Sequence, residues 1–88
     1  MTTLQITTPN DVYQLVERLK TACQQNGAAE LFNRLDDAMN LGSSALEILG
    51  AIRQTFIGNR SEVERLLGRN GKEEVDGVIA FVDKAYGR

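Results

Sequence analysis

The side chains that most often carry enzyme chemistry are scarce in this chain. Its 88 residues include no histidine, the commonest general base and the usual partner of a nucleophilic serine or cysteine. The single cysteine, Cys23, excludes an intramolecular disulfide and a zinc site built from cysteines. Neither a GxxxxGK(S/T) loop nor a GxGxxG loop occurs. We therefore expect a protein that is not an enzyme and that has no cofactor and no metal site.

The carboxylates supply at most an incomplete metal site. Asp36 and Asp37 are adjacent on an expected helix, so their side chains diverge by about 100°. Asp36 shares its face with Asn33 and Asn40, which supplies fewer oxygen ligands than the cage of about six to eight that calcium takes. A solvated helix face is the better interpretation. Cys23 falls on an apolar stripe, where a buried thiol packs as a small hydrophobe.

The region 53–72 is the most basic part of the chain. It contains Lys72 and is interrupted by Glu62 and Glu64. Its arginines form a weak candidate site for a small anion, with ordinary solvated charge as the alternative. These residues are Arg53, Arg60, Arg65 and Arg69. The whole chain has 10 basic and 12 acidic residues and a net charge of −2, which disfavours nucleic-acid binding.

Helical segments separated by glycines must position these side chains. The apolar residues recur at intervals of three and four, the pattern of helices with one buried face. Glycine readily adopts the left-handed conformation that ends a helix, and six of the eight glycines lie between such segments. We expect an extended arm over 1–8 and helices over about 9–26, 28–40, 43–57, 61–67 and 72–86. The fold class is all-α, a compact bundle of four to five helices in a single domain.

Capping residues and apolar content refine this bundle. Thr8 can cap the first helix ahead of Pro9, and Ser44–Glu47 and Ser61–Glu64 have the spacing of capping boxes. The third expected helix, 43–57, is apolar on more than one side, which is typical of a central helix. We expect the other helices to pack around it.

Two glycines lie inside expected helices, so a role in ending a helix does not explain them. Gly50 and Gly77 each weaken a helix by up to about 1 kcal/mol relative to alanine, which close approach of another backbone would justify. Phe81 and Tyr13 lie at the edges of their apolar stripes and widen them. These four residues are the candidate surface for contact with another protein or with a second copy of the chain. A second copy could also pair through Leu4–Ile6, whose alternation is typical of a strand.

One stretch resembles a known family. Leu41–Phe56, LGSSALEILGAIRQTF, resembles an acyl or peptidyl carrier protein around its modified serine, where an LG-x-x-S-L sequence opens the second helix. By this resemblance, Ser43 or Ser44 would carry phosphopantetheine. The alternative is that both serines only cap the third helix.

A second stretch, Leu67 to Ile79, resembles a helix-turn-helix with a glycine in its turn. In a DNA complex, the carboxylates of Glu73, Glu74 and Asp76 would approach the phosphates, which repel them. These acids are explained equally by the dipole of a helix that begins there.

No apolar stretch of membrane-spanning length and no signal-like N-terminus occurs. We therefore rank first a small cytoplasmic, noncatalytic protein that acts through protein–protein interaction, as an adaptor, regulator or subunit. A carrier protein and a DNA-binding regulator follow as alternatives.

Overall fold

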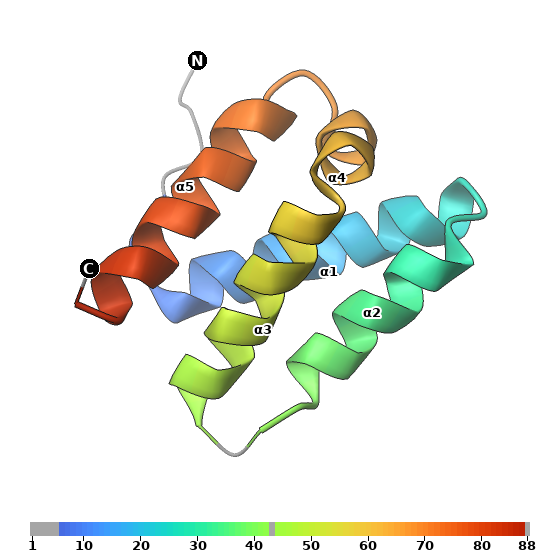
Figure 1. Ribbon diagram of the computed structural model, residues 1–88. Helices are drawn as coiled ribbons and strands as arrows, with labels where there is room; N and C mark the ends of the chain where they lie inside the picture. The colour runs from blue at the N-terminus through green and yellow to red at the C-terminus, as the bar shows by residue number, and fades with distance from the viewer. Residues whose placement is uncertain (1–5, 43, 88) are drawn as a thin grey trace.

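The computed structural model describes residues 6–42 and 44–87, and these residues form five α-helices (Figure 1). In chain order they are α1 (Pro9–Gln25), α2 (Ala29–Met39), α3 (Ala45–Gly58), α4 (Arg60–Leu67) and α5 (Gly71–Ala85). The expected all-α bundle is confirmed, and each helix end lies within two residues of its expected position. None of the described helices is long and apolar enough to span a bilayer.

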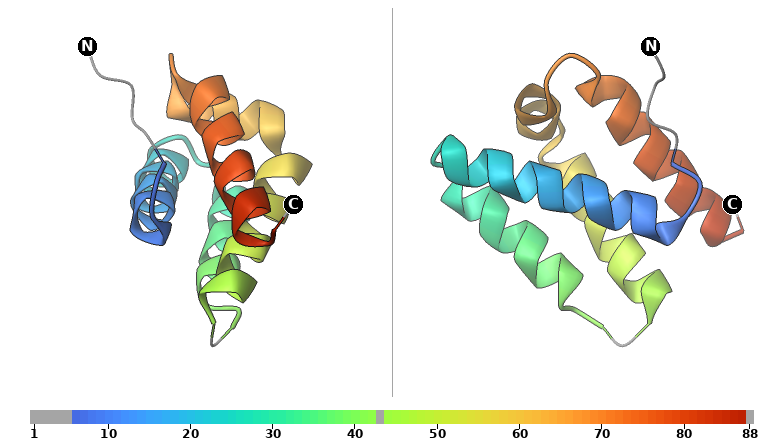
Figure 2. Two further views of the ribbon diagram at one scale, coloured as in Figure 1. Left: turned by 90° about the vertical axis from the view of Figure 1, so that its left-hand side faces the viewer. Right: turned by 180° about the vertical axis from the view of Figure 1, so that it is seen from behind.

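The helices lie in two layers. In Figure 1, α2, α3 and α5 form the front layer with α3 between the other two, and α1 crosses behind them. The side view in Figure 2 shows α1 standing apart from the layer that contains α3. The molecule is accordingly flat, with extents of 35 × 33 × 19 Å, and its shortest dimension is about two helix diameters.

The apolar core fills the space between the layers. Its fully buried side chains come mainly from α1, α3 and α5: Val12, Leu15, Val16, Leu19, Leu49, Ile52, Phe56, Val75, Val78 and Val82. α3 is central within its layer, as its composition indicates, but it buries one side only. The residues on that side recur at intervals of three and four, so the opposite side of α3 forms part of the molecular surface.

Local sequence explains how α1 and α3 begin. Thr8 caps α1 in a full capping box: Asp11 N donates to Thr8 Oγ1 at 3.2 Å, and Thr8 N donates to Asp11 Oδ2 at 3.0 Å. The backbone N–H of Thr7 donates to the same carboxylate and, together with that of Thr8, lowers the pKa of Asp11. Ser44 caps α3 by accepting a hydrogen bond from Glu47 N at 3.2 Å.

The start of α4 differs from the expectation. The helix begins at Arg60, and the residue that precedes it, Asn59, makes no capping bond with its side chain. Ser61 therefore lies inside α4, and the expected capping box from Ser61 to Glu64 is wrong. The Glu64 carboxylate instead accepts a hydrogen bond from Arg60 Nε one turn earlier. An ion pair within the helix replaces the cap that the spacing suggested.

Ion pairs join the two layers and the neighbouring helices. Arg18 on α1 reaches Glu74 on α5, with 2.6 Å between Nη2 and Oε1. Lys20 on α1 donates to Asp36 on α2 at 3.0 Å, and this hydrogen bond raises the pKa of Lys20. Because Glu74 is buried and paired with Arg18, it is not exposed to solvent, although its position near the N-terminus of α5 suits the helix dipole.

The N-terminal arm reaches α5 through Ile6. Ile6 is half-buried and packs against the core, with its Cγ1 3.4 Å from the place a Cβ on Gly77 would occupy. Leu4 lies outside the described residues, so pairing of Leu4–Ile6 with a second copy stays a prediction.

Candidate functional site

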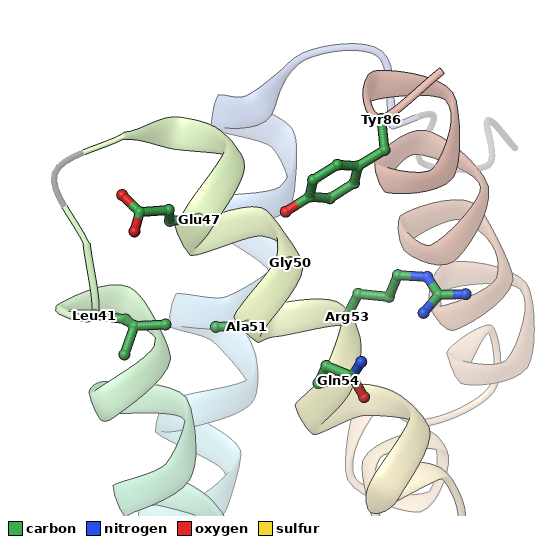
Figure 3. Close-up of a pocket in the computed structure, with 7 residues that line it drawn as sticks. All are labelled: Leu41, Glu47, Gly50, Ala51, Arg53, Gln54 and Tyr86. Carbon is green, nitrogen blue, oxygen red and sulfur yellow. The ribbon is translucent and has the colours of Figure 1, made fainter. Parts of the chain in front are cut away.

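The largest exposed apolar side chains in the described part of the chain gather around the outer side of α3. Leu46 and Ile57 lie about three helical turns apart, and hence on the same side of α3. Leu41, from the connection between α2 and α3, and Tyr86, directly after α5, flank α3 on its two sides (Figure 3). The exposed fractions are 64% for Leu41, 45% for Leu46, 44% for Ile57 and 43% for Tyr86. We call this surface, which comprises Leu41, Leu46, Gly50, Ala51, Ile57 and Tyr86, the α3 face.

The α3 face is shallowly hollowed. One open depression of about 460 Å³ runs over Gly50, Ala51 and Gln54 between the walls formed by Leu41 and Tyr86. A second depression, of about 250 Å³, shares Leu41 and Ala51 with the first and continues toward α2. The two depressions therefore adjoin at Leu41 and Ala51, and each is open to solvent along α3. Such a surface matches a protein segment better than a small molecule, which proteins usually enclose.

Tyr86 lies directly over Gly50. Its phenol donates a hydrogen bond to the Leu46 carbonyl oxygen, and its hydroxyl oxygen occupies the place that a Cβ on residue 50 would take. A Cβ at position 50 would collide with the far end of this side chain, so a larger residue there requires the Tyr86 ring to move. The crossing of another helix backbone, which the sequence suggested, does not occur there within the described residues. The contact attaches the end of α5 to the first turn of α3 and holds the aromatic ring at the surface.

The charged groups next to the α3 face already have partners. Arg53 lies 2.8 Å from Asp83 on α5, and this ion pair borders the face on the α5 side. Arg34 on α2 pairs with Glu30 at 3.3 Å. The Glu47 carboxylate accepts a hydrogen bond from the Ser44 hydroxyl at 3.2 Å. These charged groups are therefore engaged within the fold, and Glu47, Arg53 and Gln54 line the first depression together with the apolar residues.

The residues expected to form one interaction surface are divided by the fold. Gly50 belongs to the α3 face. Gly77 and Phe81 line a different depression, of about 490 Å³, between α5 and the arm at Ile6. Tyr13 lies on α1, where it is half-buried and packs against the core. Gly50 and Gly77 belong to different helices, α3 and α5. Sequence spacing does not show how two helices are placed relative to each other, so it could not show that these positions lie apart.

The arginines of the basic region pair with different carboxylates. Arg60 donates to Asp76 and to Glu64, and the Asp76 carboxylate raises the pKa of the Arg60 guanidinium. Arg65 lies 3.8 Å from Glu62. Arg69 is exposed, and within the described ranges it takes part in no ion pair. Because Arg53 is paired as well, three of the four expected anion-binding side chains are neutralised within the fold.

Only one of the two serines of the carrier-like stretch lies within the described residues. Ser43 lies outside the described residues. Ser44 is exposed, but its hydroxyl accepts from Glu47 N and donates to Glu47 Oε1, both at 3.2 Å. The hydroxyl therefore serves the start of α3.

The helix-turn-helix stretch corresponds to the end of α4, the turn over 68–70 and the first part of α5. Glu73 and Asp76 are exposed at the start of α5. Asp76 accepts from Lys72 at 3.2 Å, and hydrogen bonds from Arg60 and Lys72 lower its pKa. Asp76 is therefore already paired with two cations within the fold, and the resemblance to a helix-turn-helix stays a prediction.

The expected carboxylate face of α2 is also engaged. Asp36 is tied to Lys20, as described above, and Lys20 Nζ lies 5.2 Å from the centre of the Phe32 ring. In residues 6–42 and 44–87, no group of three or more acidic, cysteine or histidine side chains is placed to hold a metal ion.

Sequence reasoning missed the contribution of Leu41, Leu46, Ile57 and Tyr86 to one surface. The sequence did contain a signal for this surface. The apolar residues of α3 are spread over more of the helix circumference than the single buried stripe of Leu49, Ile52 and Phe56. Comparisons with protein-family models, with curated proteins and with solved structures each found no match. The functional interpretation therefore depends on the geometry of the α3 face.

Proposed function

We propose that this protein is a noncatalytic binding protein and that the α3 face is the surface with which it binds a protein partner. The observation that carries the proposal is the clustering of four large apolar side chains, each 43% to 64% exposed, around one helix. Single exposed apolar residues are normal on protein surfaces, whereas a contiguous group around a depression is typical of an interaction site.

The composition of the α3 face supports the same proposal. Protein interfaces typically have an apolar centre, frequently with an aromatic residue, and a polar rim. Here Tyr86 and the aliphatic side chains supply the apolar area, and Glu47 and Gln54, which line the same depression, supply groups for hydrogen bonds. Complete burial of a leucine or isoleucine contributes about 1.5–3 kcal/mol, so covering Leu46 and Ile57 favours a complex.

Site-specific photo-crosslinking in the cells that make the protein tests this proposal. A photoreactive amino acid at Gln54, beside the depression of the α3 face, should give discrete protein adducts after irradiation. The matched control carries the same amino acid at Gln14, which is exposed on α1 in the other layer. Adding Leu46→Asp to the Gln54 variant should remove the adducts while the far-ultraviolet circular dichroism stays unchanged. Equal labelling from both glutamine positions, or no adduct from Gln54, would count against the proposal.

A further inference from the structure

We infer that the α3 face binds a second copy of this chain, through two antiparallel α3 helices related by a twofold axis near Gly50 and Ala51. The inference rests on the proposed function of the α3 face, and it specifies the partner. Four properties of the face carry it: the unburied side of α3, the order of residues along the helix, the small side chain at its middle, and the available area.

The first property is the mismatch between the composition of α3 and its position. A helix that is apolar on more than one side is usually covered on more than one side. α3 buries Leu49, Ile52 and Phe56 but leaves Leu46 and Ile57 about half exposed in the front layer. If two copies stack with their front layers together, α3 becomes an inner helix of the assembly. A second copy therefore covers the side of α3 that a single chain leaves open.

The order of residues along α3 favours an antiparallel arrangement. Leu46 and Ile57 lie near the two ends of the α3 face, and Gly50 and Ala51 lie near its middle. Antiparallel pairing about the point between residues 50 and 51 places Glu47 opposite Gln54 of the second copy. The amide of Gln54 can then donate to the carboxylate of Glu47. A parallel pair would instead place the two Glu47 carboxylates opposite each other, which is repulsive.

The small side chain of Ala51 at the middle of α3 allows the two helices to approach closely. Packed helices lie about 8–10 Å apart, and the shorter separations need small side chains at the crossing point. Ala51 meets that need, whereas Gly50 is covered by Tyr86; Leu41 and Tyr86 stand on the two sides of the helix and form walls against which the partner would pack (Figure 3). The neighbouring Arg53 is neutralised by Asp83, so it places no unpaired cation in the contact.

The available area is sufficient for a stable dimer. A standard interface buries about 800 Å² on each partner, which is about 15% of the 5332 Å² that this protein exposes. The molecule is flat, and α3 runs along the middle of one broad side, whose extents are 35 × 33 Å. A second copy can therefore cover the required area without rearrangement of the helices.

The first experiment measures mass and proximity in the purified full chain. Light scattering should show the mass rising from 9.7 kDa toward twice that value as concentration increases. In a Cys23→Ala background, Ala51→Cys should form a disulfide with its own copy, because residue 51 lies next to the proposed axis. Gln14→Cys on α1 is the control and should not. A mixture of Glu47→Cys and Gln54→Cys chains, joined by a short bismaleimide, should give chiefly the mixed pair, whereas parallel helices would join Glu47→Cys to itself.

The second experiment assigns the dimer to the α3 face. Leu46→Asp should raise the dimer dissociation constant at least about 10-fold, because the interface would then have to cover a charged carboxylate instead of an apolar side chain. Phe81→Asp, in the separate depression by the arm, should leave that constant unchanged. A dimer that Phe81→Asp abolishes and Leu46→Asp preserves overturns the inference.

A chain that stays at 9.7 kDa up to millimolar concentration and forms no Ala51→Cys disulfide also overturns it. In that case the proposed function survives if photo-crosslinking from Gln54 still yields adducts with a different protein. Absence of every adduct contradicts both proposals, so the two failures are distinguishable.

Discussion

The Arg18 guanidinium on α1 meets the Glu74 carboxylate on α5 at 2.6 Å, and the two side chains differ sharply in exposure. Arg18 is 51% exposed, whereas Glu74 is 4% exposed. The arginine therefore extends from the surface over a carboxylate that the fold has removed from water. Loss of the cation would leave a buried charge without its partner, which costs more than loss of a surface pair.

Arg18→Ala should therefore lower the free energy of unfolding by about 1–2 kcal/mol in urea titrations. This value is below the usual cost of breaking a buried pair because the Arg18 side chain is half exposed to solvent. Arg34→Ala is the matched control, since Arg34 and Glu30 are 53% and 85% exposed, and it should cost less than about 0.5 kcal/mol. Adding Glu74→Gln to Arg18→Ala should restore part of the loss. Equal costs for the two arginines would refute the account.

Gly71, at the first position of α5, is the glycine whose backbone approaches another helix most closely among those inside or at the ends of helices. A Cβ on Gly71 would collide with the Glu64 carbonyl oxygen on α4 and lie 3.0 Å from the Glu64 Cα. Gly71→Ala should therefore destabilise the protein by about 1–3 kcal/mol. Gly58 ends α3, has open space where a Cβ would lie and has no positive φ. Gly58→Ala should raise stability by up to about 1 kcal/mol in the same measurement. Similar effects at both positions would contradict this difference.

The Asp11 carboxylate makes the folding stability depend on pH in the acidic range. Hydrogen bonds from the backbone of Thr7 and Thr8 lower its folded pKa below the ordinary 3.8, so the unfolded chain binds the proton more tightly. The contribution of the carboxylate is present above its unfolded pKa and is lost as pH falls through the lower folded pKa. Melting temperatures of the wild type and Asp11→Asn should therefore differ at neutral pH and converge in strong acid. The lowered pKa of Asp76 affects both proteins alike and cancels in this difference. A gap that stays constant with pH would exclude the mechanism.

Cys23 should resist thiol reagents while the protein is folded. Its side chain is fully buried, and burial raises the pKa of the thiol, so little thiolate is present or accessible. Ellman's reagent at mildly alkaline pH should react slowly with native protein and rapidly in urea. Gln24→Cys in a Cys23→Ala background moves the thiol to an exposed neighbouring position and should react at once without urea. Rapid native labelling of Cys23 would show that the α1–α2 contact opens readily.

Features that depend on residues within about one helical turn could be predicted from the sequence. The cap at Thr8 follows from the chemistry of a side chain and the N–H groups beside it. The buried stripe of α1 follows from its 3.6-residue period, and Cys23 lies on it. The cap expected at Ser61 was wrong even though it is local. Ser61 has the required spacing, but α4 already begins at Arg60, where ion pairs with Glu64 and Asp76 hold its first turn.

The candidate site could be predicted only in part. The sequence shows that α3 is more apolar than one buried stripe requires, and it shows Gly50 inside that helix. The identity of the group over Gly50 depends on Tyr86, which is distant in sequence and reaches α3 only because α5 packs beside it. The same holds for Glu74, whose partner Arg18 comes from the other layer.

By itself, the sequence determined the all-α class and the approximate ends of the helices, because period, caps and glycines act through neighbouring residues. The tertiary structure decided which side of each helix faces the core, since burial depends on the angles at which helices cross and on contacts between distant residues. It thereby buried Glu74, which the sequence assigned only to a helix start, and left Leu46 and Ile57 at the surface, although the helix that carries them was expected to be central. The α3 face results from that choice: one helix flanked by two others in a layer that a single opposing helix covers from behind (Figure 2).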